Sequence, residues 1–186
     1  SVLPLQPSAG LLACDRIGDG RMADPQLIEL AAASLFKGGG KRAIVRRDWR
    51  GRRLLVTAGA TEERIDAARL LSNRSSGRMG VLVAQAARLR GAEVDLIHGP
   101  LQVPSAWLEG LNAHPITSSQ DLERELIRHQ PAADAVAMLA AVADLRRCDG
   151  GLAEKPSKQE LPGVMQAGWQ EVPDLLRGLV VRRPPG

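Results

Sequence analysis

The sequence predicts an α/β fold in which helices cover both faces of a mostly parallel sheet, preceded by a short tail and linker. Three observations favour this class. Short apolar runs typical of strands alternate with helical patterns from residue 52 to residue 144. Such alternation is typical of strand–helix–strand units, whose strands are parallel. The strand-like runs end in glycine, serine or aspartate, at the edge of the sheet where these folds bind ligands.

The first 50 residues are expected to form the tail and linker, and residues 51–186 the main domain. Asp24 and Pro25 suit the N-cap and first position of a helix, which continues to Phe36 and ends at KGGGKR. Basic residues then crowd segment 41–53, with a single aromatic residue, Trp49. A site for nucleic acid would need more aromatic platforms, so we expect a solvated linker and no nucleic-acid partner.

Four strands are expected in the main domain. The runs RRLLVTAG, AEVDLIHG, HPITS and ADAVAMLAAVAD occupy residues 52–59, 92–99, 114–118 and 133–144. The last run is long and continuously apolar, as in a buried parallel strand. With the helices between them, these strands predict a Rossmann-like sheet.

Two helices are expected between the strands. The first should begin at Ser76 and stop at Gly91. Its predicted apolar stripe consists of Met79, Leu82, Val83, Ala86 and Leu89. The second should span residues 118–130, with Ser118 and Asp121 as a capping box.

The composition fits a globular chain, with 44% hydrophobic residues, 25% charged residues and a net charge of +4. No apolar run approaches the roughly 20 residues that a membrane-spanning helix requires, so no membrane partner is expected. The two cysteines, Cys14 and Cys148, offer neither a disulfide framework nor a metal-ligand spacing. We therefore expect a cytoplasmic protein whose positive charge favours anionic ligands, such as phosphates or nucleotides.

The stretch LSNRSSGRMG, residues 71–80, closes an unusually long connection between a strand and a helix. It delivers Ser75, Ser76 and Gly77 to the helix N-terminus, followed by Arg78. Free backbone N–H groups, the positive end of the helix dipole, two hydroxyls and a guanidinium suit a phosphate or carboxylate. The same residues would also serve as an ordinary helix cap, and spacing alone leaves both interpretations open.

A second loop of interest follows the last predicted strand. Asp144 ends that strand, and Lys155 and Lys158 follow in the segment EKPSK. A carboxylate at a strand end can hold a ribose, a base or a metal ion, and a loop lysine can reach phosphate oxygens. Taken alone, the three residues favour a turn cap and two surface charges over a binding site.

The segments TAGAT, IDAAR, LSNRSSGRMG, AAVADLR and EKPSK, in this order, resemble the phosphopantothenoylcysteine synthetase family, also called phosphopantothenate–cysteine ligases. The N-terminal LACDRIGDGRMADP resembles the substrate clamp of the flavin-dependent phosphopantothenoylcysteine decarboxylase, which bacteria fuse in front of the ligase. The resemblance covers about residues 11–25 and 52–176. It implies a fragment of a bifunctional enzyme of coenzyme A biosynthesis, with the end of the decarboxylase domain in residues 1–50 and a C-terminally truncated ligase domain in residues 51–186.

The resemblance also implies a reaction. In this family CTP activates the carboxylate of 4'-phosphopantothenate as an acyl-cytidylate, and the amine of cysteine then displaces CMP. Such chemistry favours Mg²⁺ and cationic or amide groups around the phosphorus, without a protein nucleophile. FMN would be needed only with the missing decarboxylase domain. The full-length enzyme is expected to be a homo-oligomer.

Residue roles follow from the matched motifs. Asn73 corresponds to the asparagine implicated in handling the intermediate, and Lys155 to the first lysine of a KxKK motif. Cys14 corresponds to the proton donor of the decarboxylase, which would act only in a complete enzyme. The remaining expected binding residues, from the loops and the motifs together, are Ser75, Ser76, Gly77, Arg78, Met138, Leu139, Ala140, Asp144, Lys158, Val172, Pro173, Asp174 and Leu175. No metal ligand is assigned.

Departures from the family pattern leave two alternatives open. EKPSK has Pro156 and Ser157 in place of an aliphatic residue and a lysine, VPD lacks the family's asparagine, and the clamp has Asp15 and Arg16 in place of a glycine and an acid. The first alternative is an inactive nucleotide-binding or dimerisation module. The second, suggested by the TAGAT turn, is a nicotinamide-dependent short-chain reductase, which would need a catalytic tyrosine that this sequence lacks.

Overall fold

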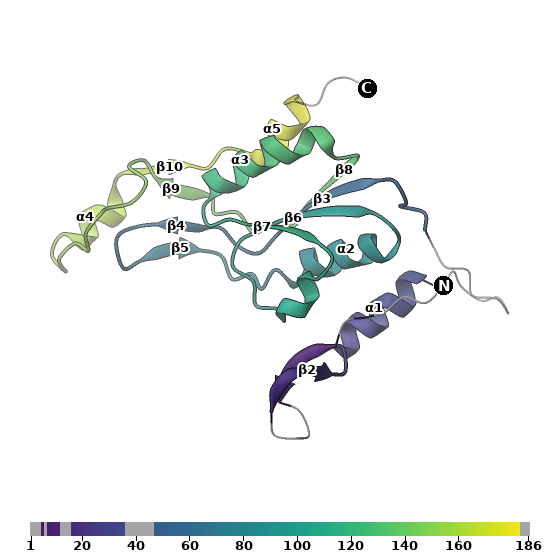
Figure 1. Ribbon diagram of the computed structural model, residues 1–186. Coiled ribbons are helices and arrows are strands. Elements are labelled where there is room, and N and C mark those ends of the chain that lie inside the picture. The colour runs from purple at the N-terminus through teal and green to yellow at the C-terminus, as the bar shows by residue number, and fades with distance from the viewer. Residues whose placement is uncertain (1–4, 6, 12–15, 36–46, 183–186) are drawn as a thin grey trace.

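A four-stranded parallel sheet forms the centre of the molecule (Figure 1). The computed structural model describes residues 5, 7–11, 16–35 and 47–182. The strand order is β7 (Asn112–Pro115), β6 (Glu93–His98), β3 (Arg53–Ala58) and β8 (Ala135–Met138), and all three pairings are parallel. The predicted α/β class and parallel sheet are confirmed.

Helices cover both faces of this sheet (Figure 1). On one face lies α2 (Arg78–Leu89), with α1 (Pro25–Leu35) packed against it. On the other lie α3 (Ser119–His129) and α5 (Leu175–Arg182). Side chains of β3 alternate between the two cores: Val56 packs in the α2 core, and Leu55 in the α3 core.

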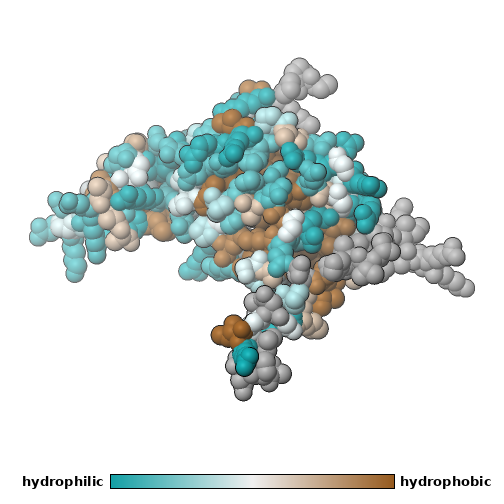
Figure 2. All heavy atoms as spheres, viewed as in Figure 1, coloured by the Kyte–Doolittle hydropathy of each residue, from teal (hydrophilic) through white to brown (hydrophobic). Residues whose placement is uncertain are grey.

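Short elements extend the fold to one side (Figure 1). Two antiparallel strand pairs, β4 (Glu62–Arg64) with β5 (Leu70–Ser72) and β9 (Leu145–Arg147) with β10 (Trp169–Glu171), form an arm together with α4 (Leu161–Gln166). This arm is mainly hydrophilic in Figure 2, where hydrophobic residues gather over the centre of the molecule. The remaining elements are the hairpin β1 (Ser8–Leu11) and β2 (Ile17–Arg21) and the short 3-10 helices η1 (Ser105–Leu108) and η2 (Gln130–Ala132).

The strand predicted over residues 133–144 is wrong in its length. It ends at Met138, because the Thr57 hydroxyl accepts the next two backbone N–H groups, those of Leu139 at 2.9 Å and Ala140 at 3.0 Å. Beyond them, Ala141 makes one isolated parallel bridge to Ala60. The chain then leaves the sheet for the arm instead of continuing as a strand.

The apolar stripe predicted for α2 is wrong at Met79, but it is confirmed at Leu89, which is buried, and at Leu82, which packs against the core. Met79 is 67% exposed, whereas Val81 and Ala84 are fully buried. The helix starts at Arg78, and Gly80 packs so closely on β3 that an added Cβ would lie 2.5 Å from the Ala58 Cβ. The following residue, Val81, packs in the core between the helix and the sheet. The strand expected at residues 114–118 lies at Asn112–Pro115.

The capping box of α3 is confirmed. The Ser118 Oγ accepts the Asp121 N–H at 3.2 Å, and the Asp121 carboxylate accepts the Ser118 N–H at 2.9 Å. Burial pushes the pKa of Asp121 up, but the hydrogen bonds from Ser118, Arg124 and Thr117 outweigh it and lower the pKa below its usual value. The ionised carboxylate therefore stabilises the folded state.

Replacing Asp121 with alanine should lower the free energy of unfolding by about 1 kcal/mol at neutral pH. Because the folded-state pKa lies below the unfolded value of about 3.9, this contribution is complete above that value and is lost as the pH falls through the folded-state pKa. Urea denaturation at neutral pH and at low pH measures the difference. Gln120→Ala, at the exposed neighbouring position, serves as the control. An equal loss for Asp121→Ala at both pH values would contradict this account.

Candidate active site

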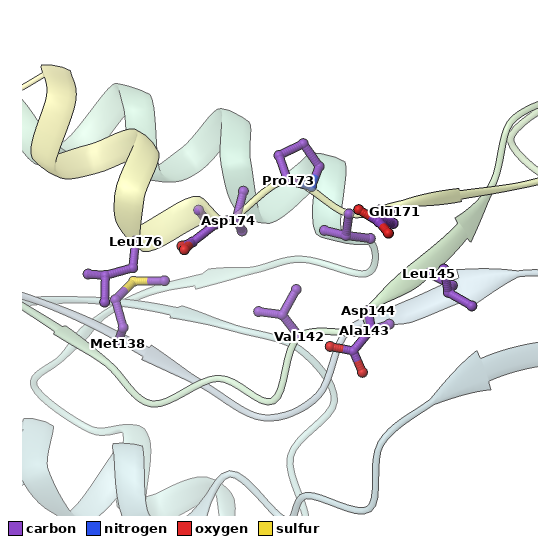
Figure 3. Close-up of a pocket in the computed structure, with 11 residues that line it drawn as sticks. Met138, Val142, Ala143, Asp144, Leu145, Glu171, Pro173, Asp174 and Leu176 are labelled. Atoms are coloured by element: carbon purple, nitrogen blue, oxygen red, sulfur yellow. The ribbon is translucent and has the colours of Figure 1, made fainter.

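Two cavities open at the carboxyl end of the sheet. The first, about 520 Å³, is called the acidic cavity here because Asp144, Glu171 and Asp174 line it beside apolar side chains (Figure 3). The second, about 630 Å³, is called the loop cavity because the loop from Ser72 to Ser76 forms much of its wall. Ligands of open α/β sheets bind at this end of the strands.

Two buried threonines hold the segment after β8 between these cavities. Thr57 accepts the N–H groups that follow Met138, and the Thr61 hydroxyl accepts the Ala143 N–H at 3.0 Å. Both threonines are fully buried, so these bonds are shielded from water. They fix the backbone that carries Val142 and Asp144.

Asn73 connects the two cavities. Its side chain belongs to the loop cavity, and its Nδ2 donates to the Val142 carbonyl at 2.9 Å. Val142 in turn lines the acidic cavity (Figure 3). The Asn73 amide is therefore held at the boundary between them, and the structure gives its Oδ1 no hydrogen-bond partner among the described residues.

The N-terminus of α2 lies beside the loop cavity. Ser75 and Ser76 accept the N–H groups of Gly77 and Arg78 over long distances of 3.4 Å each, and no side chain caps the helix in the usual way. Within the described part of the chain, no acceptor takes the N–H groups of Met79 or Gly80. Gly77 has φ +72°, and an added Cβ would lie 2.1 Å from Leu101, so glycine is required at this turn.

Arg78 points away from this loop. Its guanidinium lies over the Trp107 ring, 5.9 Å from the ring centroid, and lines a separate cavity beside Asp24 and Pro25. The guanidinium of the loop cavity belongs instead to Arg74. Arg74 stands in the same stretch of residues 71–80, but no sequence pattern favours it over Arg78 as the anion-binding arginine.

The acidic cavity gathers several of the predicted binding residues. Met138, Asp144, Val172, Pro173, Asp174 and Leu175 all line it. The Val172 N–H donates to the Asp144 carbonyl at 2.8 Å, and the Asp174 carboxylate accepts the Arg177 N–H at 2.9 Å at the start of α5. Leu139 and Ala140, whose N–H groups donate to the Thr57 hydroxyl, do not line this cavity.

Other predicted residues lie elsewhere. Lys155 and Lys158 are exposed in the segment between β9 and α4, and neither lines the two cavities. That segment is attached to the β4–β5 hairpin, where the Leu152 N–H donates to the Ile65 carbonyl at 3.0 Å. Cys14 lies outside the described residues.

The charges of the two cavities differ. Among the described residues that line it, the acidic cavity has three carboxylates and no basic side chain. It therefore suits a neutral polar group or a group that arrives with a cation. The loop cavity combines Arg74, hydroxyls and the α2 N-terminus with a single carboxylate, that of Glu62, and suits an anion. Glu62 and Gln102, like the two threonines, were not predicted as site residues, although hydroxyls inside the apolar run of β3 were a signal for Thr57.

A family model described as the DNA/pantothenate metabolism flavoprotein C-terminal domain matches residues 49–185. The chain belongs to this family. The resemblance of residues 52–176 to this family, inferred from the motifs, is therefore confirmed, and most residues that line the two cavities fall within the matched range. No helix of the described residues is long and apolar enough to cross a membrane.

Relatives of the family differ in activity and are longer than this chain. It is 36% identical over 184 residues to the coenzyme A biosynthesis bifunctional protein CoaBC of Mycobacterium tuberculosis, covering 98% of this chain and 42% of the relative. It is 38% identical over 141 residues to a cysteine/cysteine sulfinic acid decarboxylase of an unknown prokaryotic organism, covering 75% of this chain and 38% of the relative. The chain thus spans about two fifths of the length of these relatives.

A solved structure of the same family has a similar fold. The crystal structure of the C-terminal domain of the bifunctional protein CoaBC is 33% identical, with a TM-score of 0.52 over 66% of this chain and 63% of that one. The parallel sheet flanked by helices is therefore a fold that this chain shares with the C-terminal domain of CoaBC.

Proposed function

We propose that this chain carries the phosphopantothenate–cysteine ligase activity of coenzyme A biosynthesis and uses CTP. The bond from Asn73 to the Val142 carbonyl carries the proposal, because it places one amide between an acidic cavity and an anion-binding cavity. A ligase of this class must hold a nucleotide and an acyl group on either side of one phosphorus atom. The family membership and the CoaBC relatives support the same reaction.

The two cavities divide the reactants between them. We assign the cytidine of CTP to the acidic cavity, where Asp144 can accept from ribose hydroxyls or the base amino group. We assign the phosphate of 4'-phosphopantothenate to the loop cavity, where Arg74, Ser75 and Ser76 lie beside the α2 N-terminus. The pantothenate carboxylate then reaches the boundary between the cavities.

Asn73 acts at that boundary. An amide can donate to the oxygen that becomes negative as the carboxylate attacks phosphorus, and it does not compete as a nucleophile. The same group can hold the acyl-cytidylate while the cysteine amine attacks its carbonyl carbon and CMP leaves. Because Val142 anchors Asn73 and Thr61 anchors the Val142–Ala143 backbone, the amide needs little reorganisation.

The proposed site can bind Mg²⁺ if the phosphates of CTP supply part of its ligands. Mg²⁺ sites use one or two carboxylates together with substrate phosphates and waters. The carboxylates of the acidic cavity do not converge into a three-ligand cluster among the described residues. With Asp144 assigned to the cytidine, Glu171 or Asp174 would hold the ion together with the phosphates of CTP. The ion would supply charge neutralisation at the triphosphate.

Product analysis tests the proposal. Pyrophosphate release should require CTP and 4'-phosphopantothenate, and CMP release should require cysteine in addition. A folded chain that releases neither product would contradict the proposal. We place the reaction in the cytoplasm. We expect the enzyme to act as a homo-oligomer, together with a decarboxylase domain that uses FMN.

One observation favours a second candidate function, a nucleotide-binding module without turnover. Lys155 and Lys158 lie outside both cavities, although the family resemblance gives Lys155 a catalytic role. If Lys155 takes part, Lys155→Gln should reduce CMP release, while Lys158→Gln, also exposed on this segment, serves as the comparison. An inactive wild type that Lys155→Gln leaves unchanged would favour the binding module.

Asp144→Asn should weaken CTP binding about tenfold and leave binding of 4'-phosphopantothenate nearly unchanged, because a neutral amide no longer attracts a cation-bound nucleotide. Calorimetric titration with each ligand measures the two affinities. Glu154→Gln, an exposed change of the same charge on the arm, is the control. Equal weakening of both ligands would overturn the division of the reactants between the cavities.

A further inference from the structure

Asp95, His114 and His129 form a cluster away from both cavities, on the sheet face covered by α3. Asp95 lies within β6, His114 on the neighbouring β7, and His129 is the last residue of α3. One ligand atom from each lies within 4.8 Å of the other two. No other group of three histidine, cysteine, aspartate or glutamate side chains meets this condition among the described residues.

The distances are close to those of a metal site. The Asp95 Oδ1 lies 3.2 Å from the His114 Nε2 and 3.9 Å from the His129 Nδ1. A tetrahedral zinc ion with bonds of about 2.1 Å requires ligand atoms about 3.4 Å apart. Small rotations of the two rings, whose centroids are 4.1 Å apart, would bring all three atoms to one ion.

Neighbouring side chains supply the outer contacts that such a site needs. The free ring nitrogen of His129, Nε2, is buried without a hydrogen bond of good geometry, and it lies 3.4 Å from a Glu125 carboxylate oxygen. A metal-bound histidine characteristically donates its other N–H to a carboxylate. On the other side, the Arg53 Nε lies 3.6 Å from the Asp95 Oδ2, the oxygen that faces away from the histidines.

The local charge permits a cation. Two guanidinium groups oppose the cation. Arg53 pairs with Glu93 at 3.0 Å and with Asp95 at 3.6 Å. Arg128 pairs with Glu125 at 3.6 Å. The three carboxylates of these pairs still outnumber the two guanidinium groups. The side chains of His114, His129 and Asp95 are 27%, 17% and 10% exposed. An ion could therefore enter from solvent and keep a water as its fourth ligand.

We propose that Asp95, His114 and His129 bind one divalent transition-metal ion of the zinc class. Two imidazoles with one carboxylate suit zinc or cobalt better than magnesium or calcium, which prefer oxygen ligands alone. The ion would attach the C-terminal end of α3 to strands β6 and β7. This site is separate from the proposed ligase site, so either can fail without the other.

Titration of the metal-free chain with Co²⁺ tests the site, because cobalt reports its ligands by absorption. We expect one ion per chain, bands typical of nitrogen and oxygen ligands, displacement by Zn²⁺, and a rise in melting temperature with Zn²⁺. His114→Gln and His129→Gln should each weaken binding more than about tenfold and abolish the thermal shift. His98→Gln, which changes the third histidine at the far end of β6, should leave binding unchanged.

Three results would overturn the proposal: no stoichiometric binding, affinity unchanged in both histidine variants, or an intense thiolate charge-transfer band that assigns the ion to a cysteine. Asp95→Asn adds a variant of nearly equal volume. If it folds, shown by circular dichroism, and binds Co²⁺ as tightly as the wild type, the carboxylate is not a ligand and the proposed site is wrong.

Discussion

Replacing Asn73 with alanine is expected to reduce cysteine-dependent CMP release by about 100- to 1,000-fold. The Asn73 amide donates to the Val142 carbonyl at the boundary of the two cavities, and the proposed reaction places the developing negative charge there. Removing a hydrogen-bond donor that is already oriented toward such a charge lowers the reaction rate strongly and changes the free energy of unfolding only slightly. The rate of CMP release at saturating substrates measures the effect.

The change should leave the fold nearly intact, because Asn73 is exposed and its lost hydrogen bond is worth about 1 kcal/mol. Asn112→Ala, at an exposed position on β7, is the matched control and should keep full activity. Asn73→Asp keeps the volume but adds a negative charge, and it should be at least as inactive as Asn73→Ala. A folded Asn73→Ala variant with near-normal turnover would refute the assigned role.

Replacing Gly99 with alanine is expected to lower the free energy of unfolding by at least about 2 kcal/mol. An added Cβ would lie 1.8 Å from the Ala60 carbonyl oxygen, where the segments leaving β3 and β6 cross. The Ala60 carbonyl is a backbone group and cannot rotate away as a flexible side chain can. The two segments that follow β3 and β6 would therefore have to move apart. Because Ala60 also lines the loop cavity, ligand binding should weaken as well.

Urea denaturation followed by tryptophan fluorescence measures the stability change, since Trp107 is buried in the α2 core. Gly178→Ala is the matched control, because an added Cβ there meets open space within α5. It should stabilise the chain by about 0.5–1 kcal/mol. If Gly99→Ala were as stable as wild type, the close crossing would not exist in solution.

The sheet and the helices could be predicted because the apolar residues of each element repeat at the spacing of a strand or of a helix. The parallel strands and the Ser118–Asp121 capping box depend on nearby residues, which the sequence displays. The early end of β8 depends on a contact distant in the sequence, from the Thr57 hydroxyl to Leu139 and Ala140. No pattern within residues 133–144 shows that a distant hydroxyl, instead of a neighbouring strand, accepts these two N–H groups.

The roles of the candidate site residues stay predictions, and the structure adds only where these residues lie. Asn73 and Asp144 were identified by resemblance to family motifs, and the structure places them beside adjoining cavities. The choice between Arg74 and Arg78 depended on which guanidinium Trp107 attracts, 29 residues beyond Arg78. The cluster of Asp95, His114 and His129 was not predicted, because its members come from three different elements.

The most direct test of the ligase assignment is calorimetric titration of the chain with CTP and Mg²⁺, with and without 4'-phosphopantothenate, using ATP as the control nucleotide. The proposed site predicts binding that favours CTP over ATP, strengthens with 4'-phosphopantothenate and weakens in Asp144→Asn. Absence of binding by either nucleotide to a chain shown to be folded would contradict the proposed function.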